Sequence, residues 1–458
     1  MYIKQIYTSC LAQASYYIES KGCAAVVDPI RDVDVYLDLA KERNAKIQYV
    51  LETHFHADFV SGHLELARKT GAMILFGPGA RPGYKAIVAK NEDDIYLGEI
   101  KIKLIHTPGH TIESACFLVY DEHKLPYAVF TGDTLFVGDV GRPDLGSGNM
   151  DQTELASMLY DSLNSKIMPL PDHVIVYPGH GAGSACGKNM SKETWSTIGE
   201  QKLKNYALQK MSKSDFIKRV TEDLPSVPPY FLHDAKANKD GYDNLENVLT
   251  KGTKALNAEQ FHSEMKLGSV VLDVRNSTEF GIGFIKGSIN IGLDGSFAVW
   301  AGNIIPADKS IVLVVRDNQK EEAVTRLARI GFDKVNGYLK DDLIGWINAH
   351  YPVDHVQTIS EQQLEKFLSA GYTPLDVRTT TEAASGRMTG ALHVPLNTLQ
   401  AKLSLLNPEK KYMVYCMGGY RSMIAVSILK ANGFSQVVNV RGGIIQVKKE
   451  APLLIERI

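Results

Sequence analysis

One segment constrains this chain more than any other: residues 53–63 hold three histidines and an aspartate within eleven positions. The segment follows a short apolar run at 47–51, typical of a buried strand, and the residues after Gly62 favour the start of a helix. A rigid strand end and a curling loop let imidazoles and a carboxylate converge on one ion. This mixture of ligands favours a transition metal. The competing interpretation is a histidine-rich surface loop without a ligand role.

Matching residues follow three other predicted strands. His110 and His180 each come directly after a Pro-Gly pair, and Asp133 lies in a tight Thr-Gly-Asp turn. Glycine at such corners lets the backbone bend sharply and approach a bound group closely. A single corner of this kind is usually an ordinary turn, but four together predict a metal centre.

Length and composition limit the remaining choices. A chain of 458 residues is too long for one core and predicts two to four domains. The formal net charge of −2 gives no reason to expect nucleic acid or an anionic membrane as a partner. No apolar run approaches the roughly 20 residues that cross a bilayer, and the N-terminus shows no secretory signal. Five scattered cysteines favour a reducing cytoplasm over a disulfide framework.

The strand-end motifs together resemble the metallo-β-lactamase superfamily. The resemblance rests on residues 53–58, 107–110, 130–136 and 177–180. Residues 133–144 resemble the persulfide dioxygenase branch of that superfamily. The implied fold of residues 1–250, including a linker from about residue 222, is a four-layer αββα arrangement with two sheets face to face and helices outside.

One departure from the superfamily pattern bears on the metal content. The superfamily's hydrolases carry a histidine directly after the aspartate of the first motif, as a ligand for a second metal, and this chain has Phe59 there. We therefore expect one ion. The resemblance assigns His54, His110 and Asp133 as ligands of a single Fe(II) per chain, a two-histidine, one-carboxylate face typical of non-haem iron oxygenases. A zinc site on His54, His56 and His110 is the alternative.

The resemblance also implies supporting residues. Three of them would orient ligands or substrate: His56, Asp58 and His180. Tyr177 would form a hydrogen bond near the iron, with packing in the core as its second interpretation. Arg142 would bind the carboxylate of a thiol cofactor, with a surface ion pair as the alternative. Cys186 lies in a glycine-rich loop after His180, and is either a sulfur carrier facing the metal cavity or an inert thiol.

The rest of the chain contains an internal repeat of about one hundred residues. Residues 271–275 recur at 374–378, and residues 287–291 recur at 390–394. Alternating strand and helix patterns predict two α/β domains with parallel sheets, at 251–352 and 353–458.

The second copy carries a cysteine loop. Residues 416–422 lie between an apolar strand and a helix pattern, so backbone N–H groups and the helix N-terminus favour a thiolate. With residues 375–378 this loop resembles the rhodanese family of sulfurtransferases. The implied residues are the sulfur carrier Cys416, the bracing or anion-binding Arg421 and Arg378, and the loop glycines Gly418 and Gly419. A buried cysteine at a turn and a phosphatase loop, usually one residue longer, are the rivals.

The first copy lacks this chemistry. Keeping the register of both flanks puts Val314 at the place of Cys416 and Gln319 at the place of Arg421, and the repeat contains no cysteine. We therefore expect a catalytically silent middle domain.

These features together predict a cytoplasmic persulfide dioxygenase fused to a rhodanese. It would oxidise the persulfide of glutathione, coenzyme A or bacillithiol with O₂ to sulfite and thiol, and Cys416 would move sulfane sulfur to or from thiosulfate. A zinc thioester hydrolase of glyoxalase-II type is the alternative enzyme. A sulfur carrier or persulfide sensor with a vestigial metal domain is the alternative of another class. Such families suggest a homo-oligomer, a dimer or tetramer.

Overall fold

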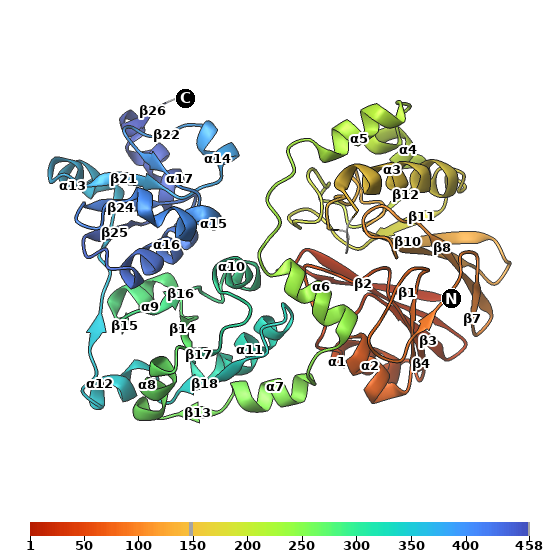
Figure 1. The fold of residues 1–458 in the computed structure, drawn as a ribbon, viewed down its shortest axis with the longest axis horizontal. Coiled ribbons are helices and arrows are strands. Elements are labelled where there is room, and N and C mark those ends of the chain that lie inside the picture. The colour runs from red at the N-terminus through yellow and green to blue at the C-terminus, as the bar shows by residue number, and fades with distance from the viewer. Residues whose placement is uncertain (146–149, 457–458) are drawn as a thin grey trace. The chain divides into compact units, whose positions relative to one another are not determined.

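The computed structural model describes residues 1–145 and 150–456 (Figure 1). The chain forms two compact units, Met1–Leu245 with Ala328–Gly331, and Glu246–Leu327 with the residues from Phe332 onward. Within the described residues, every helix is too short or too polar to cross a membrane.

The N-terminal unit contains two six-stranded sheets. The first sheet runs, in spatial order, through β1 (Tyr2–Thr8), β2 (Gln13–Ser20), β3 (Cys23–Val27), β4 (Lys46–Leu51), β5 (Met73–Phe76) and β6 (Ile87–Val88). The second runs through β12 (Ser196–Thr197), β11 (Ile175–Pro178), β10 (Pro126–Gly132), β9 (Ala115–Tyr120), β8 (Ile100–His106) and β7 (Asp94–Leu97). The helices are α1 (Asp34–Glu42), α2 (His63–Thr70), α3 (Gln152–Ser162), α4 (Ile198–Lys204), α5 (Lys213–Thr221) and α6 (Phe231–Asp240).

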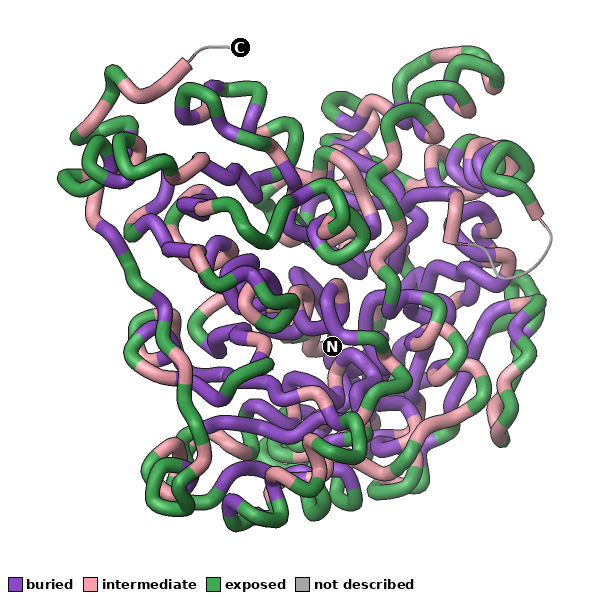
Figure 2. Tube along the Cα trace, turned by 60° about the vertical axis from the view of Figure 1, so that its left-hand side comes forward, coloured by how far each residue is buried: buried purple, intermediate pink, exposed green. Residues whose placement is uncertain are grey.

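The alternation of side chains along β2 explains the layers. Tyr16 and Ile18 point to one face and join Phe117 and Phe130 of the second sheet in a shared core. Tyr17 points to the opposite face, where it packs with residues of α1 and α2. Because successive side chains of a strand alternate between faces, a strand buried on both faces lies between a sheet and a helix layer. Figure 2 shows long buried stretches of the chain trace, and the residues of β2 and β9 are almost all buried. Helix α3 covers the outer face of the second sheet. The predicted four-layer fold is confirmed.

Two stretches differ from the sequence patterns. The helical pattern at 192–220 divides into β12, α4 and α5. The expected linker after residue 222 instead contains α6, whose Asn238 is fully buried against the histidine-rich segment. The sequence pattern did not predict this buried helix, because in a sequence a polar residue that binds backbone groups cannot be told from a solvent-exposed one.

The C-terminal unit contains two five-stranded parallel sheets and two short antiparallel pairs. The first sheet is β13 (Ala255–Leu256), β18 (Val335–Leu339), β17 (Ile311–Val314), β14 (Val270–Asp273) and β16 (Ile289–Asn290). The second is β20 (Thr358–Ile359), β25 (Val437–Val440), β24 (Tyr412–Tyr415), β21 (Thr373–Asp376) and β23 (Leu392–His393). The pairs are β15 (Phe284–Ile285) with β19 (Val353–Asp354), and β22 (Arg387–Met388) with β26 (Ile455–Glu456). The helices are α7 (Leu245–Gly252), α8 (Ala258–Lys266), α9 (Ser277–Ile282), α10 (Phe297–Ile304), α11 (Lys320–Ala328), α12 (Asp342–Asn348), α13 (Leu364–Ser369), α14 (Thr380–Ala384), α15 (Leu396–Leu399), α16 (Tyr420–Ala431) and α17 (Gly443–Glu450).

The two parallel sheets confirm the predicted tandem α/β domains and correct their alignment. Asp273 lies opposite Val314 in the first domain, and Asp376 lies opposite Tyr415 in the second. The residue after the strand, Val315, is therefore the counterpart of Cys416. The sequence register was wrong by one residue because the loops after the two strands differ in length.

Candidate metal centre and sulfur-transfer loop

The histidine and aspartate side chains of the N-terminal unit meet at one end of its two sheets. His54 follows β4, His110 follows β8, Asp133 follows β10 and His180 follows β11. All four side chains are at most 2% exposed. The two sheets therefore deliver polar groups from four strand ends into one water-poor space.

Three of these residues form a group suited to one ion. His54, His110 and Asp133 each offer one ligand atom, and these atoms lie within 4.8 Å of one another. Asp133 Oδ2 lies 3.4 Å from His110 Nε2 and 3.9 Å from His54 Nε2. That oxygen is buried and has no hydrogen-bond partner among the described residues. A buried acceptor without a donor is costly, so this donor set fits a metal ion.

The hydrogen-bond partners of the two Nδ1 atoms fix which tautomer His54 and His110 adopt. His110 Nδ1 lies 2.8 Å from the carbonyl oxygen of Arg142, which can only accept, so Nδ1 carries the proton. Thr53 Oγ1 donates to Asp28 Oδ2 at 2.8 Å, and therefore accepts from His54 Nδ1 at 2.9 Å. In both rings the Nε2 lone pair is left free toward Asp133, as a metal ligand requires.

The other oxygen of Asp133 is held by His180. His180 Nδ1 donates to Asp133 Oδ1 at 2.8 Å, and its Nε2 lies 2.8 Å from Asp58 Oδ2. Burial opposes ionisation of His180, but the Asp133 and Asp58 carboxylates raise its pKa well above the ordinary value. Burial likewise opposes ionisation of Asp133, but the positive charge and the hydrogen bond of His180 hold its pKa well below the ordinary range. The result is an imidazolium between two carboxylates.

Cys186 lies beside this chain of charges. Its sulfur, the Asp58 carboxylate and a His180 nitrogen lie within 4.8 Å of one another. Burial, followed by the negative charges of Asp58 and Asp133, raises the pKa of the Cys186 thiol well above its usual value. An ion-free thiol in this place is therefore protonated at neutral pH. The structure thus places the Cys186 thiol beside Asp58 and His180, and its role as a sulfur carrier or an inert thiol stays a prediction.

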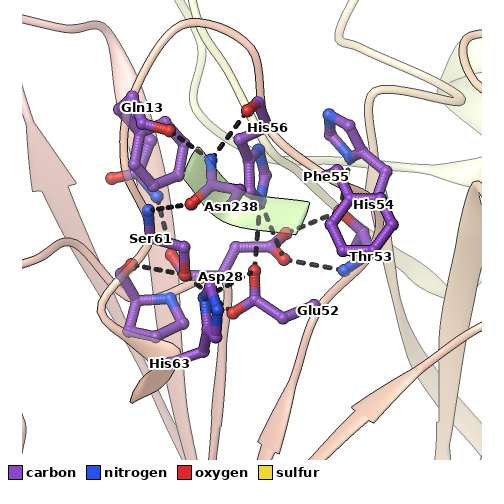
Figure 3. A network of polar contacts seen from close by, with 12 residues as sticks. Gln13, Asp28, Glu52, Thr53, His54, Phe55, His56, Ser61, His63 and Asn238 are labelled. Atoms are coloured by element: carbon purple, nitrogen blue, oxygen red, sulfur yellow. Dashed lines mark hydrogen bonds and ion pairs between the residues drawn. The ribbon is translucent and has the colours of Figure 1, made fainter. Parts of the chain in front are cut away.

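His56 lies beside the three-ligand group, with its ring centroid 4.2 Å from that of His54, but its nitrogen belongs to a separate group with Asp28 and Glu52. Its Nε2 lies 3.1 Å from Asp28 Oδ1 and 3.9 Å from Glu52 Oε2 (Figure 3). Its ring packs at 4.3 Å from the ring of Phe59, which is fully buried. Burial and the Asp28 charge raise the pKa of Glu52 well above its ordinary value. These contacts favour a supporting role for His56 over the zinc-ligand role of the alternative set.

Asp28 and Asn238 are residues that the sequence did not single out. Asp28 accepts from both the backbone N–H and the hydroxyl of Thr53. Asn238 donates to the carbonyls of His56 and Phe59 and accepts from the N–H of Ser61, so it holds the loop closed (Figure 3). Asp28 carried a weak signal, since it ends a predicted strand, and Asn238 carried none.

Arg142 and Tyr177, which the sequence placed near the metal or the substrate, contact neighbouring residues of the fold. The Arg142 guanidinium is 3% exposed and forms a bidentate pair with Asp144, with further bonds to the carbonyls of Ala185 and Pro225. A substrate carboxylate would have to displace Asp144. The structure therefore gives Arg142 an internal role, in which its backbone carbonyl accepts the hydrogen bond from His110 Nδ1. Tyr177 stacks on Phe130 with ring centroids 5.3 Å apart, which is the core packing that the sequence left open.

The second candidate site is the loop after β24. Gly419 N–H donates to Cys416 Sγ at 3.1 Å, and Sγ lies 3.7 Å from Ser422 Oγ. Gly419 has a φ of +106°, a left-handed conformation in which glycine is favoured. Gly443 approaches from α17, and a Cβ there would lie 2.4 Å from the Cys416 carbonyl oxygen. The loop therefore curls around the sulfur and presents the Gly419 N–H to it.

The arginines of this domain brace the fold. Arg378 is fully buried and forms a bidentate pair with Asp376, which favours the bracing role among the two that the sequence left open. Arg421 forms a bidentate pair with Glu382. This pair lowers the pKa of Glu382 to about 2, chiefly through the hydrogen bonds from Arg421. Arg421 thus ties the start of α16 to α14.

Comparisons with known proteins agree with this architecture. The family model of the metallo-beta-lactamase superfamily matches residues 8–180, and that of the rhodanese-like domain matches residues 257–349 and 360–450. A crystal structure of a metallo-beta-lactamase from Staphylococcus aureus has 34% sequence identity and a TM-score of 0.66, and the match covers 74% of this chain and 98% of that one.

Curated relatives cover part of this chain. The cytoplasmic hydroxyacylglutathione hydrolase of Arabidopsis thaliana is 34% identical over 39% of this chain and 67% of its own length. A probable hydroxyacylglutathione hydrolase of Schizosaccharomyces pombe is 32% identical over 34% of this chain, and this chain spans 58% of that relative's length.

A double sheet sandwich with ligand-bearing strand ends defines a metal-binding αββα protein. The chain belongs to the metallo-β-lactamase superfamily and carries two rhodanese-like domains after its metal-binding unit.

Proposed function

We propose that the N-terminal unit is an iron-dependent persulfide dioxygenase, with one Fe(II) per chain, and that the last domain is a sulfurtransferase whose carrier is Cys416. The observation that supports this is the combination of a buried His54, His110 and Asp133 group with Phe59 in place of a second-metal ligand. The balanced reaction joins RSSH, O₂ and H₂O to give RSH, SO₃²⁻ and two protons. The outer sulfur loses four electrons and dioxygen gains them.

The protein's own residues prepare this centre. A bound ferrous ion supplies the redox chemistry between dioxygen and the outer sulfur of the persulfide. His54 and His110 offer Nε2 because Thr53 and the Arg142 carbonyl occupy their Nδ1 atoms. His180 occupies Asp133 Oδ1 and leaves Oδ2 as the ligand oxygen. Burial of all four side chains excludes bulk water, which strengthens each of these electrostatic contacts.

Sulfur transfer at Cys416 needs no external oxidant. The thiolate attacks the outer sulfur of thiosulfate, the S–S bond breaks, and sulfite leaves with the bonding electron pair. The resulting Cys416 persulfide then passes its outer sulfur to a thiol or, in reverse, to sulfite. The N–H of Gly419 at 3.1 Å from Sγ supports the negative charge of the Cys416 thiolate.

A glyoxalase-II-like thioester hydrolase is the second candidate. The named relatives of the N-terminal unit are hydroxyacylglutathione hydrolases, and this favours hydrolysis. Against it stands the Phe59 ring, which has no lone pair for a second metal.

Metal analysis combined with a hydrolysis assay separates the two candidates. Protein purified without added metal should contain about one iron per chain and hydrolyse S-lactoylglutathione no faster than its His110→Ala variant. Two zinc ions per chain with hydrolysis that the His110→Ala change abolishes would establish the hydrolase instead.

A further inference from the structure

A cavity of about 540 Å³ lies beside the sulfur-transfer loop, within the C-terminal unit. One side is formed by the loop residues Gly418, Gly419 and Tyr420. Other lining residues belong to the middle domain, among them Thr278 and Ile282 of α9. A domain without a catalytic cysteine therefore borders the loop that holds one.

The cavity has preformed walls. The Tyr420 hydroxyl donates to the carbonyl of Gly292 at 2.7 Å, and the N–H of Asn290 donates to Ser427 Oγ at 2.9 Å. Both bonds join the middle domain to α16, the helix that begins at the sulfur loop. A Cβ at Gly418 would meet nothing within 4 Å, so this part of the loop faces open space. The same loop holds Cys416 Sγ through Gly419.

The volume is too large for the inorganic substrate alone. Cavities that bind small organic molecules span roughly 300–1,000 Å³, whereas one water takes about 30 Å³ of liquid volume. Thiosulfate has only five heavy atoms and would leave most of the space filled by water. The cavity therefore has the size for an organic sulfur donor or acceptor.

The charged residues that line the cavity indicate which kind of organic ligand fits it. Arg441 and Asp294 both line the cavity, both are exposed, and neither forms an ion pair within the described part of the chain. Ile282 also lines it, and this apolar residue is 79% exposed. An unpaired cation, an unpaired anion and an apolar surface together match a ligand with a carboxylate, an ammonium and a short carbon chain.

We propose that this cavity binds a zwitterionic low-molecular-weight thiol, of about tripeptide size, as the sulfur acceptor of Cys416, and that the middle domain supplies its specificity. The inference rests on the proposed role of Cys416 as sulfur carrier. In the step itself the acceptor thiolate attacks the outer sulfur of the Cys416 persulfide. A new S–S bond forms, the Cys416 Sγ–S bond breaks, and Cys416 leaves as thiolate, with no net oxidation.

The test measures acceptor preference in the full-length protein with thiosulfate as donor. The acceptors are neutral 2-mercaptoethanol, anionic 3-mercaptopropionate and cationic cysteamine, and each rate is divided by the rate with mercaptoethanol so that general losses cancel. Arg441→Gln should lower the mercaptopropionate ratio about tenfold, and Asp294→Asn the cysteamine ratio by a similar factor, since each change removes one charge-assisted contact. Lys449→Gln and Asp308→Asn, which alter exposed charges away from the cavity, should keep both ratios.

A substitution in the middle domain tests its contribution directly. Thr278 is exposed on α9, so Thr278→Phe should leave the melting temperature unchanged while it raises the KM for glutathione relative to that for mercaptoethanol. Unchanged ratios in all three cavity variants would overturn the inference. Failure of the proposed carrier role would look different: Cys416 would then gain no sulfur atom, by mass, on incubation with thiosulfate.

Discussion

The hydrogen bonds behind His54 give the sharpest prediction for the metal centre. Thr53→Val keeps the shape of the side chain and removes its hydroxyl. Two buried hydrogen bonds are lost, the one donated to Asp28 Oδ2 at 2.8 Å and the one accepted from His54 Nδ1 at 2.9 Å. His54 then loses the partner that keeps its proton on Nδ1, and its Nε2 is no longer reserved for the metal.

The expected size follows from these two contacts. A buried carboxylate that loses one donor, and an imidazole N–H that loses its acceptor, together cost about 2–5 kcal/mol. Part of this cost lowers the free energy of unfolding. The part that acts through His54 should weaken Fe(II) binding about 10- to 100-fold, the range seen when a ligand loses its supporting partner.

The assay is an anaerobic Fe(II) titration with a competing chelator, together with thermal melting of the metal-free protein. The control is Thr221→Val, which removes a hydroxyl that donates to the carbonyls of Ile217 and Lys218 on α5, in an exposed part of the fold. If Thr53→Val bound iron as tightly as the unmodified protein and Thr221→Val did the same, the assignment of His54 and its tautomer would be refuted.

Three further predictions concern the last domain. Glu382 has a pKa of about 2, below the value of about 4.3 expected in the unfolded chain. Its pair with Arg421 therefore contributes stability above pH 4.3, and this stability is lost as the pH falls toward 2. In urea melts over this range, the free energy of unfolding of Glu382→Gln should depend less on pH, by under about 1 kcal/mol because solvent screens the pair. Gly443→Ala places a Cβ 2.4 Å from the Cys416 carbonyl at a φ of +57°, and should destabilise this domain by about 1–3 kcal/mol in the same melts, whereas an unchanged midpoint would contradict the close approach. Cys416→Ser should abolish thiosulfate sulfurtransferase activity and keep persulfide-dependent oxygen uptake, and loss of both activities would contradict two separable sites.

Sequence reasoning located the polar strand ends because strand, turn and ligand follow one another locally. His54, His110 and Asp133 each come within a few residues of an apolar run that folds as a buried strand. Asn238 has no such signal, because its role depends on α6 packing against the loop at residues 56–61. Local patterns report alternation and turns, and they do not report which distant helix satisfies a loop's backbone groups.

Arg142 and Arg378 share a local sequence pattern that predicts an internal ion pair. Arg142 and Arg378 each have an aspartate two residues away, Asp144 and Asp376, and both pairs are bidentate in the structure. A buried guanidinium needs a partner of opposite charge, so an aspartate at this spacing favours an internal pair over substrate binding. The one-residue shift to Val315 has a different cause, because the loops after β17 and β24 differ in length and the register is fixed only by pairing with β14 and β21.

Oxygen consumption on addition of glutathione persulfide tests the central claim most directly. With iron-loaded protein in an oxygen electrode, the account predicts one O₂ consumed and one sulfite formed per persulfide, with uptake lost in His110→Ala. Sulfite formation without oxygen uptake, or uptake that survives the loss of His110, would contradict it.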